Sequence, residues 1–484
     1  MATSRPLPAL ALDRAAAVPL SAQLATALRR EAMAGRLVDG DRLPSTRALA
    51  VRLGVSRTVT AAAYEELQAE GWLQGRTGAG TYVAARPPRS PGVRDLPTAH
   101  PTTTPTTTRT PTTTTTLEAD PRLLDLSPGT PWAAGVDRDA WRRAWRRAAD
   151  HPPAAHRAAG GAEAYRRCVA ETFLAHRGLV VDDPLAPDGV LATAGTSAAV
   201  GELATAVLRP GDRVAVEDPG YGRAVASLRA AGVDVVRAPV DEHGLDPDAV
   251  PADVRAVYSS PAHQYPLGAR MPVARRVRLV ERARAHGWLV LEDDYDGELR
   301  FDVAPPPVLA ALARDVVIHL GTTSKVLSPS LGCGWMVAPG PVAERLLAHR
   351  RRTSIAPPIA GQHVLVEFAR TGDLGRHLRR LRRELAARRA LLVEALGAQG
   401  IEVPGVDAGA HVVVRLPDAA AETAALDAGR AAGMRLDPLS RHYHGPHPGH
   451  GIVVGYAGLD RADLPAVIRM LTGLAGWERA RRSP

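Results

Sequence analysis

The sequence predicts a multidomain protein in which a small unit, mainly α with a small β hairpin, precedes a large α/β domain. Three patterns along the chain give this prediction. Residues 1–85 carry apolar residues at helical spacing and end in a glycine-rich turn between two short strand-like runs. Residues 86–120 consist largely of threonine and proline. From residue 121 to residue 480, apolar runs alternate with helical periods, which is typical of a mainly parallel or mixed sheet covered by helices.

The N-terminal unit contains a candidate DNA-binding element. In RLPSTRALAVRLGVSRTVTAAAYEELQAEGWL, two helical periods are separated by Gly54, and Ser45 and Ser56 stand at their N-cap positions. Two helices joined by a tight glycine-containing turn form a helix-turn-helix, and the run GRTGAGTYVA predicts a hairpin wing after it. A small helical bundle with a hairpin would give the same pattern.

Five positions in this element favour contact with DNA. The first turn of the second helix of a helix-turn-helix reaches base edges. Arg57, Thr58 and Thr60 occupy that turn, Arg47 lies where the preceding helix meets the DNA backbone, and Arg76 belongs to the wing. We therefore expect these side chains to face DNA.

The Thr/Pro-rich stretch, residues 86–120, separates the two units. It has too few apolar residues to offset the conformational entropy that ordering would cost, and its prolines stiffen the chain. We expect a semi-extended, disordered linker.

Lys325, in the stretch VVIHLGTTSKVLSPSLGCGWMV, is the only lysine of the chain, so 59 of the 60 Lys+Arg residues are arginines. Arginine replaces lysine in salt bridges but keeps its proton, whereas a lysine amine can attack a carbonyl. The single lysine therefore indicates a role that needs an amine, such as the Schiff base that holds pyridoxal 5'-phosphate (PLP). The alternative is that one lysine survived by chance in an arginine-rich chain.

Polar residues are expected at the same edge of the sheet as this lysine. The turn with Thr196 and Ser197 leads into a helix, and its exposed amides suit an anion. Tyr221 follows the strand RVAVED, at the carboxyl end where open α/β sheets bind ligands. Small turns before helices are common, so the anion seat alone is a weak signal.

Three carboxylates, Glu292, Asp293 and Asp294, crowd the end of the predicted strand GWLVLEDD. Burying them is costly unless a cation meets at least one. A protonated pyridine nitrogen or a metal ion would serve. Because Lys325 follows the next predicted strand, the pattern favours PLP over a metal.

Residues 1–85 resemble the winged helix-turn-helix of GntR-type repressors, through PLSAQL and the run from GRLVDGDRLPS to GAGTYVA. The resemblance covers nearly the whole unit. It implies that Arg47, Ser56, Arg57, Thr58 and the wing around Gly78 and Gly80 face operator DNA.

Residues 121–480 are similar to fold-type I aminotransferases, and more narrowly to the PLP-binding domain of MocR-type regulators, in which a GntR winged helix is fused to such a domain. The strings GTSA, VAVEDPGYG, HQYPLG, LEDDYDGELRF and GTTSKVLSP carry the resemblance. It implies that Lys325 forms the Schiff base with PLP and that Asp293 pairs with the pyridine nitrogen. The other implied cofactor-binding residues are Tyr295 at the phenolic oxygen, Tyr221 against the ring, Thr196, Ser197, Thr322 and Ser324 at the phosphate, and His263 and Tyr265 of HQYPLG.

Three positions depart from the family pattern. Gly332 stands where an arginine usually clamps the phosphate, Val453 where an arginine grips the substrate carboxylate, and Tyr265–Gly268 where an Asn-Pro-Thr-Gly-like turn is usual. We therefore expect weaker PLP binding than in an enzyme, and transamination that is absent or of low activity. Arg223 is a candidate anchor for an effector carboxylate; its alternative role is a solvated surface charge.

The histidine-rich run RHYHGPHPGH, residues 441–450, has no regular metal-ligand spacing. We expect a mobile loop over the pocket mouth and no metal site.

The resemblance implies a PLP-dependent transcriptional regulator that senses PLP or an amino compound and acts as a head-to-tail homodimer on a repeated operator. Two alternatives stay open: a working aminotransferase, and a regulator whose large domain has lost PLP and only dimerises. The chain has two cysteines, no metal-type cysteine spacing and no long apolar run. We therefore expect a cytoplasmic protein, associated with the nucleoid and not with a membrane. The net charge of +9 allows a polyanionic partner without proving one.

Overall fold

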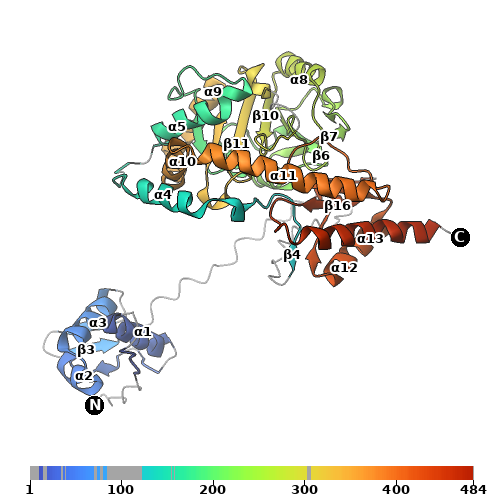
Figure 1. The fold of residues 1–484 in the computed structure, drawn as a ribbon. Helices are drawn as coiled ribbons and strands as arrows, with labels where there is room; N and C mark the ends of the chain where they lie inside the picture. Colours follow the sequence, from blue (N-terminus) through green and yellow to red (C-terminus); the bar gives the residue numbers. More distant parts are fainter. Residues whose placement is uncertain are drawn as a thin grey trace, which may run out of the picture. The chain divides into compact units, whose positions relative to one another are not determined.

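The computed structural model describes residues 10–14, 19–33, 36–38, 40–69, 73–76, 80–83, 123–153, 155–156, 158–301, 307–447 and 449–482. The chain divides into two compact units, residues 1–115 and 116–484, and each unit is considered by itself (Figure 1). The predicted linker, residues 86–120, lies outside the described residues.

The N-terminal unit packs helices against a small antiparallel sheet. Its elements are α1 (Leu20–Met33), β1 (Arg42–Leu43), α2 (Thr46–Leu53), α3 (Arg57–Ala69), β2 (Leu73–Arg76) and β3 (Gly80–Val83), with β3 between β1 and β2. Leu24 and Leu28, which stand one helical turn from each other on α1, are buried in one apolar core with Leu49 of α2 and Leu67 of α3.

The two helix starts and the turn between the helices are capped as the sequence predicts. Ser45 Oγ accepts a hydrogen bond from the Ala48 amide at 3.2 Å, and Ser56 Oγ accepts one from the Val59 amide at 3.3 Å. Gly54 ends α2 with φ of 63°, in the left-handed region that favours glycine. The expected helix-turn-helix, followed by a hairpin, is therefore confirmed.

The large unit is built on an eight-stranded sheet with the order β5-β12-β11-β10-β9-β6-β7-β8. Strands β11, β10, β9, β6 and β7 run parallel to their neighbours in this group, β12 is antiparallel to β11 and β5, and β8 is antiparallel to β7. The strand bounds are β5 (Leu191–Thr193), β6 (Arg213–Asp218), β7 (Asp234–Asp241), β8 (Gly244–Leu245), β9 (Ala256–Ser259), β10 (Leu289–Asp294), β11 (Val317–Thr322) and β12 (Gly334–Val337).

Helices lie on both faces of this sheet, since successive residues of the central strands enter different apolar cores. Val290 and Val317 belong to one core, whereas Leu291 and Ile318 belong to the other. The helices are α4 (Arg138–Ala149), α5 (Glu163–Val169), α6 (Thr196–Ala206), α7 (Gly222–Ala230), α8 (Val273–His286), α9 (Gly340–Thr353), α10 (Ile359–Arg370) and α11 (Asp373–Gly397). This arrangement is the predicted α/β fold.

The C-terminal part of the large unit forms a smaller antiparallel sheet next to the long helix α11 (Figure 1). Its strands β13 (His411–Leu416), β16 (His450–Gly455) and β15 (Asp437–Pro438) pair in that order. The helices α12 (Ala419–Ala431) and α13 (Leu464–Arg482) accompany it, and β14 (Met434–Arg435) pairs in parallel with β4 (Leu124–Asp125). The first described strand of the unit is thus joined to its C-terminal part. No helix within the described ranges is long and apolar enough to cross a membrane.

Candidate cofactor and DNA-binding sites

The site is built where the carboxyl ends of parallel strands meet at one edge of the large sheet. Asp293, near the end of β10, lies opposite Leu320 of β11 in the register. Lys325 follows β11 by three residues, and Tyr221 follows β6. Parallel strands place their carboxyl ends on the same side of a sheet, so the amine, the carboxylate and the aromatic ring come from different strands to one place.

Lys325 is half-buried, and its Nζ donates a hydrogen bond to the carbonyl oxygen of Gly129 at 2.9 Å. Burial, and after it the positive charge of Arg223, lower the pKa of the Lys325 amine below its ordinary value of 10.5. A larger fraction of the amine is therefore neutral, which is the form that attacks an aldehyde.

The three carboxylates at the end of β10 have different partners. Glu292 accepts hydrogen bonds from the amides of Leu309 and Ala310 at 2.5 and 3.1 Å, and lies 3.1 Å from His319 Nδ1. Asp294 accepts two hydrogen bonds from Arg177, at 2.9 and 3.0 Å. Other residues of the chain therefore supply hydrogen-bond partners to both Glu292 and Asp294.

Asp293 differs from both neighbours. Its Oδ2 accepts a hydrogen bond from the Tyr258 hydroxyl, but its Oδ1 is buried and has no hydrogen-bond partner within the described residues. Burial raises the pKa of this carboxyl to about 7. A buried acceptor without a donor costs free energy, and a protonated pyridine nitrogen is a donor that would satisfy it.

An anion seat lies at the start of α6. Gly195, the N-cap residue, gives the helix no side-chain cap, so its first amides lack side-chain partners. A Cβ built on Gly195 would lie 3.6 Å from Thr322 Oγ1 and 4.0 Å from Ser324 Oγ, so two hydroxyls border the same space. Thr196 is buried at the helix start, and Ser197 Oγ lies 2.9 Å from the Tyr221 hydroxyl. The residues predicted to bind the phosphate, Thr196, Ser197, Thr322 and Ser324, therefore lie close together at the start of α6.

Gly332 leaves this seat without the arginine that the family pattern places seven residues after the lysine. It ends a short turn (Pro329–Leu331) with φ of 58°, in the left-handed region, where an arginine would be strained. Position 332 thus contributes no side-chain donor to the seat.

An aromatic wall borders the other side of the site. The ring of Tyr265 meets the rings of Tyr221 and Tyr295 edge-on, with centroids 5.9 Å away in both cases. It also lies 5.3 Å from His411 and 5.1 Å from His442. Such edge-on contacts are favourable for aromatic rings and hold Tyr265 in the centre of the wall.

His263 links this wall to a buried carboxylate. Its Nδ1 lies 2.7 Å from Asp296 Oδ2 and 3.0 Å from the Tyr295 hydroxyl. All three groups come from the HQYPLG and DDYDG segments on neighbouring strand ends. The structure therefore brings His263 and Tyr295 together, as their assignment to one site predicts.

Arg223 lies in the first turn of α7, two residues after Tyr221, and its side chain is exposed. Its charge acts on both Tyr221 and Lys325, and at Lys325 it lowers the pKa. Val453, by contrast, is buried in an apolar cluster with Leu267, Val413 and Leu439. Arg223 is therefore the cation whose charge reaches Lys325, and position 453 offers none.

The histidine-rich run is attached to the body of the large unit, which does not agree with the mobile loop expected from its composition. His442 is buried and its Nε2 lies 2.9 Å from Asp437 Oδ2. The His444 amide donates to Asp218 Oδ1 at 2.7 Å, and Arg237 donates to the carbonyl of Pro446 at 2.9 Å. Composition missed these contacts because they are made with distant parts of the chain.

The helix-turn-helix exposes most of the residues predicted to face DNA. Arg47 on α2, and Ser56, Arg57 and Thr58 at the start of α3, are exposed. Gly80 is exposed at the start of β3. Gly78 and the side chain of Arg76 lie outside the described residues.

Thr60 was expected to face DNA, and the structure corrects this expectation. Its side chain is fully buried, and its hydroxyl donates to the carbonyl oxygens of Thr46 and Arg57 at 2.8 and 2.9 Å. Because α3 begins at Arg57, Thr60 lies on the inner face of the helix and connects it to α2. Its role is to fix the angle of the two helices.

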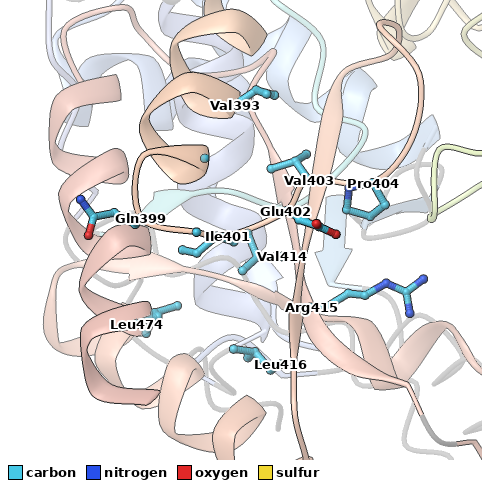
Figure 2. A pocket seen from close by; sticks show the side chains of 12 residues that line it. Val393, Gln399, Ile401, Glu402, Val403, Pro404, Val414, Arg415, Leu416 and Leu474 are labelled. Atoms are coloured by element: carbon cyan, nitrogen blue, oxygen red, sulfur yellow. The ribbon is translucent and has the colours of Figure 1, made fainter. Parts of the chain in front are cut away.

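A hollow of about 1030 Å³ lies among α11, β13 and α13, and Figure 2 shows its lining. Most of its side chains are apolar, with Glu402 and Arg415 as the charged members. None of the predicted site residues lines it, so the chemistry of Lys325 and Asp293 belongs to a different place.

A winged helix-turn-helix, together with an aminotransferase-type fold that carries a lysine and an aspartate at one sheet edge, defines a DNA-binding regulator with a cofactor-type domain. Comparison with known proteins gives the same two parts. Residues 20–83 match the family of bacterial regulatory proteins named gntR. Residues 130–435 match aminotransferase class I and II.

The chain belongs to the MocR-type subfamily of the GntR transcriptional regulators. It is 34% identical to the HTH-type pyridoxine biosynthesis transcriptional regulator PdxR of Corynebacterium glutamicum, over 95% of this chain and 96% of the relative. It is 33% identical to a probable rhizopine catabolism regulatory protein, MocR, of Rhizobium meliloti, over 93% of this chain and 92% of the relative. Among solved structures, the α-aminoadipate aminotransferase LysN of Thermus thermophilus superposes with a TM-score of 0.65 at 25% identity, covering 74% of this chain and 94% of that one.

Three residues of the site were not singled out from the sequence. Tyr258, in the middle of the apolar strand AVYSS, contacts Asp293, and His411 closes the aromatic wall. Gly129 contacts Lys325 from a segment 196 residues away. A hydroxyl within an otherwise apolar strand was an available signal for Tyr258, whereas no sequence pattern marks Gly129.

The buried carboxylate of Asp293 predicts a pH dependence of stability. Its pKa of about 7 in the fold, against 3.8 ordinarily, means that the folded cofactor-free protein keeps a proton that the unfolded chain releases. The stability that the protonated Asp293 carboxyl contributes is therefore lost as the pH rises from 3.8, its ordinary pKa, towards about 7. Between about pH 5 and about pH 8, the wild-type protein should lose about 2–3 kcal/mol more unfolding free energy than Asp293→Asn.

Urea unfolding of the full-length protein at both pH values, followed by circular dichroism, measures this difference. Asp315→Asn is the matched control, because Asp315 is exposed and pairs with Arg284 on the surface. Equal losses in wild type and Asp293→Asn would contradict the account of the site.

Proposed function

We propose that this regulator holds PLP at Lys325 and that the state of this site sets its affinity for operator DNA. The observation that carries the proposal is the pairing, at one sheet edge, of a nucleophilic amine with a buried aspartate oxygen that lacks a donor among the described residues. When bound, PLP supplies an aldehyde that amines capture and a ring that withdraws electrons. Lys325 would hold the aldehyde carbon, and Asp293 would keep the pyridine nitrogen protonated.

The other residues would position the cofactor. Thr196, Ser197, Thr322 and Ser324 would donate to the phosphate, Tyr221 would cover the ring, and Tyr295 would donate to the phenolic oxygen. His263 and Tyr265 would fix Tyr295 from behind, through the contacts at 3.0 and 5.9 Å. Tyr258 would hold Asp293 in place.

Gly332 provides no arginine to the seat, so the phosphate would be held mainly by the neutral donors of Thr196, Ser197, Thr322 and Ser324. Charge-assisted hydrogen bonds are about twice as strong as neutral ones, and PLP would therefore exchange with the solution more readily than in an enzyme. A dissociable ligand suits a sensor. The relative from Corynebacterium glutamicum is named for pyridoxine biosynthesis, and PLP is the phosphorylated aldehyde of the same ring, which supports PLP itself as one ligand.

Turnover as an aminotransferase would be absent or slow. Val453 offers no cation for a substrate carboxylate, so an amino acid would not be fixed for repeated proton transfers at its α-carbon. The domain would act by binding PLP or an amino compound and not by turning it over.

We further propose a head-to-tail homodimer in the cytoplasm, associated with the nucleoid, acting on a repeated or palindromic operator. A symmetric dimer presents two recognition helices to two half-sites. The exposed start of α3, together with Arg47 and the wing, would supply the DNA contacts.

Titration of the purified protein with PLP tests the central proposal. The visible absorption band that PLP develops on condensing with a lysine should appear in the wild type and be absent in Lys325→Ala. The affinity for a labelled duplex from the region upstream of the protein's own coding sequence should change on adding PLP to the wild type only. A wild type that binds this duplex equally well with and without PLP would contradict the proposal.

Arg57→Ala tests the assignment of α3. Arg57 is exposed in the first turn of this helix, and losing a base-edge contact costs about 1–3 kcal/mol. DNA affinity should fall about 5- to 150-fold in fluorescence anisotropy. Arg36→Ala removes the same charge from a residue that pairs with Glu31 outside α2 and α3, and should leave affinity nearly unchanged. Equal affinities in the two variants would remove α3 from the interface.

Arg223→Gln tests the effector anchor. If Arg223 pairs with the carboxylate of an amino compound, the variant should retain PLP capture but require about tenfold more of a carboxylate-bearing amine, such as an ω-amino acid, to alter the PLP spectrum. An amine without a carboxylate should act equally on both proteins. If the variant needed more of both kinds of amine to alter the PLP spectrum, Arg223 would not be a specific partner of the carboxylate.

A further inference from the structure

The chain enters the large unit across Lys325. Immediately after β4, residues Ser127–Pro131 form a segment that we call the entry strap. The carbonyl of Gly129, in the middle of the strap, accepts the hydrogen bond from Lys325 Nζ at 2.9 Å. The strap thus belongs to the first described residues of the large unit and contacts the reactive amine.

This contact depends on the absence of a side chain. A Cβ on Gly129 would lie 2.6 Å from Lys325 Nζ, closer than any allowed contact, and the residue has a φ of 93°. Pro128 and Pro131 flank Gly129 and Thr130 and fix their own φ angles. The strap is therefore a stiff, narrow piece of backbone that fits over the amine.

Backbone contacts tie the strap to the C-terminal sheet. The Leu126 amide donates to the carbonyl of Arg435 at 3.0 Å, and the Gly455 amide donates to the carbonyl of Leu126 at 2.7 Å. Any side chain on Gly455 would collide with Ser127, since a Cβ would lie 2.4 Å from its carbonyl oxygen. Movement of the strap would therefore disturb the backbone contacts at the end of β16.

Capture of an aldehyde changes what Lys325 can donate. The neutral amine and an aldehyde form a C=N bond and release one water, which takes both hydrogens of the amine nitrogen and the carbonyl oxygen. The nitrogen then has no hydrogen left for Gly129 unless it gains another proton, and a protonated imine carries only one. A half-buried carbonyl that loses its donor is destabilised until the strap moves or another donor replaces the amine.

We propose that the entry strap responds to the chemical state of Lys325: the free amine holds the strap through Gly129, and aldehyde capture releases it. This inference rests on the proposed function, because it takes PLP capture at Lys325 as the event that is sensed. It goes further by naming the element that responds.

Two substitutions of the same residue test the strap. Lys325→Met keeps the length of the side chain but cannot donate, whereas Lys325→Arg keeps a donor that cannot condense with an aldehyde. Without PLP, Lys325→Met should bind the upstream duplex with the affinity of the PLP-loaded wild type, which we expect to differ about fivefold or more from that of the PLP-free wild type. Lys325→Arg should match the PLP-free wild type.

Failure of the strap and failure of the proposed function give different results. If the wild type does not change its DNA affinity with PLP, the proposed function falls before any variant is made. If the wild type responds but PLP-free Lys325→Met binds DNA like the PLP-free wild type, the strap proposal alone is overturned.

Hydrogen–deuterium exchange on the wild type gives an independent measurement that needs no variant. The amides of Leu126 and Gly455, which hold the strap, should exchange about fivefold or more faster when PLP is bound. The amide of Val290, bonded within the central sheet to the carbonyl of Val316 at 2.9 Å, is the internal control. Unchanged exchange at Leu126 and Gly455 in protein that has captured PLP would overturn the proposal.

Discussion

A buried carboxylate oxygen without a hydrogen-bond partner among the described residues, Oδ1 of Asp293, is the constraint on which the rest of the site depends. Burying a carboxylate without a complete set of donors is unfavourable, and the fold satisfies its two neighbours in the chain, Glu292 with His319 and backbone amides and Asp294 with Arg177. Asp293 therefore keeps an oxygen without a donor, although the fold supplies donors to the carboxylates on either side of it. Such an exception is typical of a functional site.

The side chains at the centre of the site have more contacts within the protein than the positions at its two ends. The centre of the site is firmly built: Tyr258 holds Asp293, Asp296 holds His263, and Tyr265 is packed among four rings. The two ends are weaker, because Gly332 and Val453 stand where cations would grip the cofactor phosphate and a substrate carboxylate. In the proposed function, the centre would capture an aldehyde and the weaker ends would let it leave, which suits a reversible receptor better than a catalyst.

Sequence reasoning predicted what local pattern and strand order determine. The caps at Ser45 and Ser56, the strand that ends in Asp293 and the lysine after the next strand are all local features, and parallel pairing brings the last two together. It failed where the outcome depends on helix phase or distant contacts. Thr60 was assigned to DNA because it lies near the start of α3, but one turn of helix places it inward. The Gly129–Lys325 contact spans 196 residues and leaves no mark in the composition.

Borohydride reduction of the PLP-treated, full-length protein, followed by peptide mass spectrometry, tests the central claim most directly. Because Lys325 is the only lysine, reduction has one side-chain amine at which to fix the cofactor. The account predicts a reduced pyridoxyl group on the peptide that contains Lys325. A protein labelled only at its amino terminus, or not at all, would contradict it.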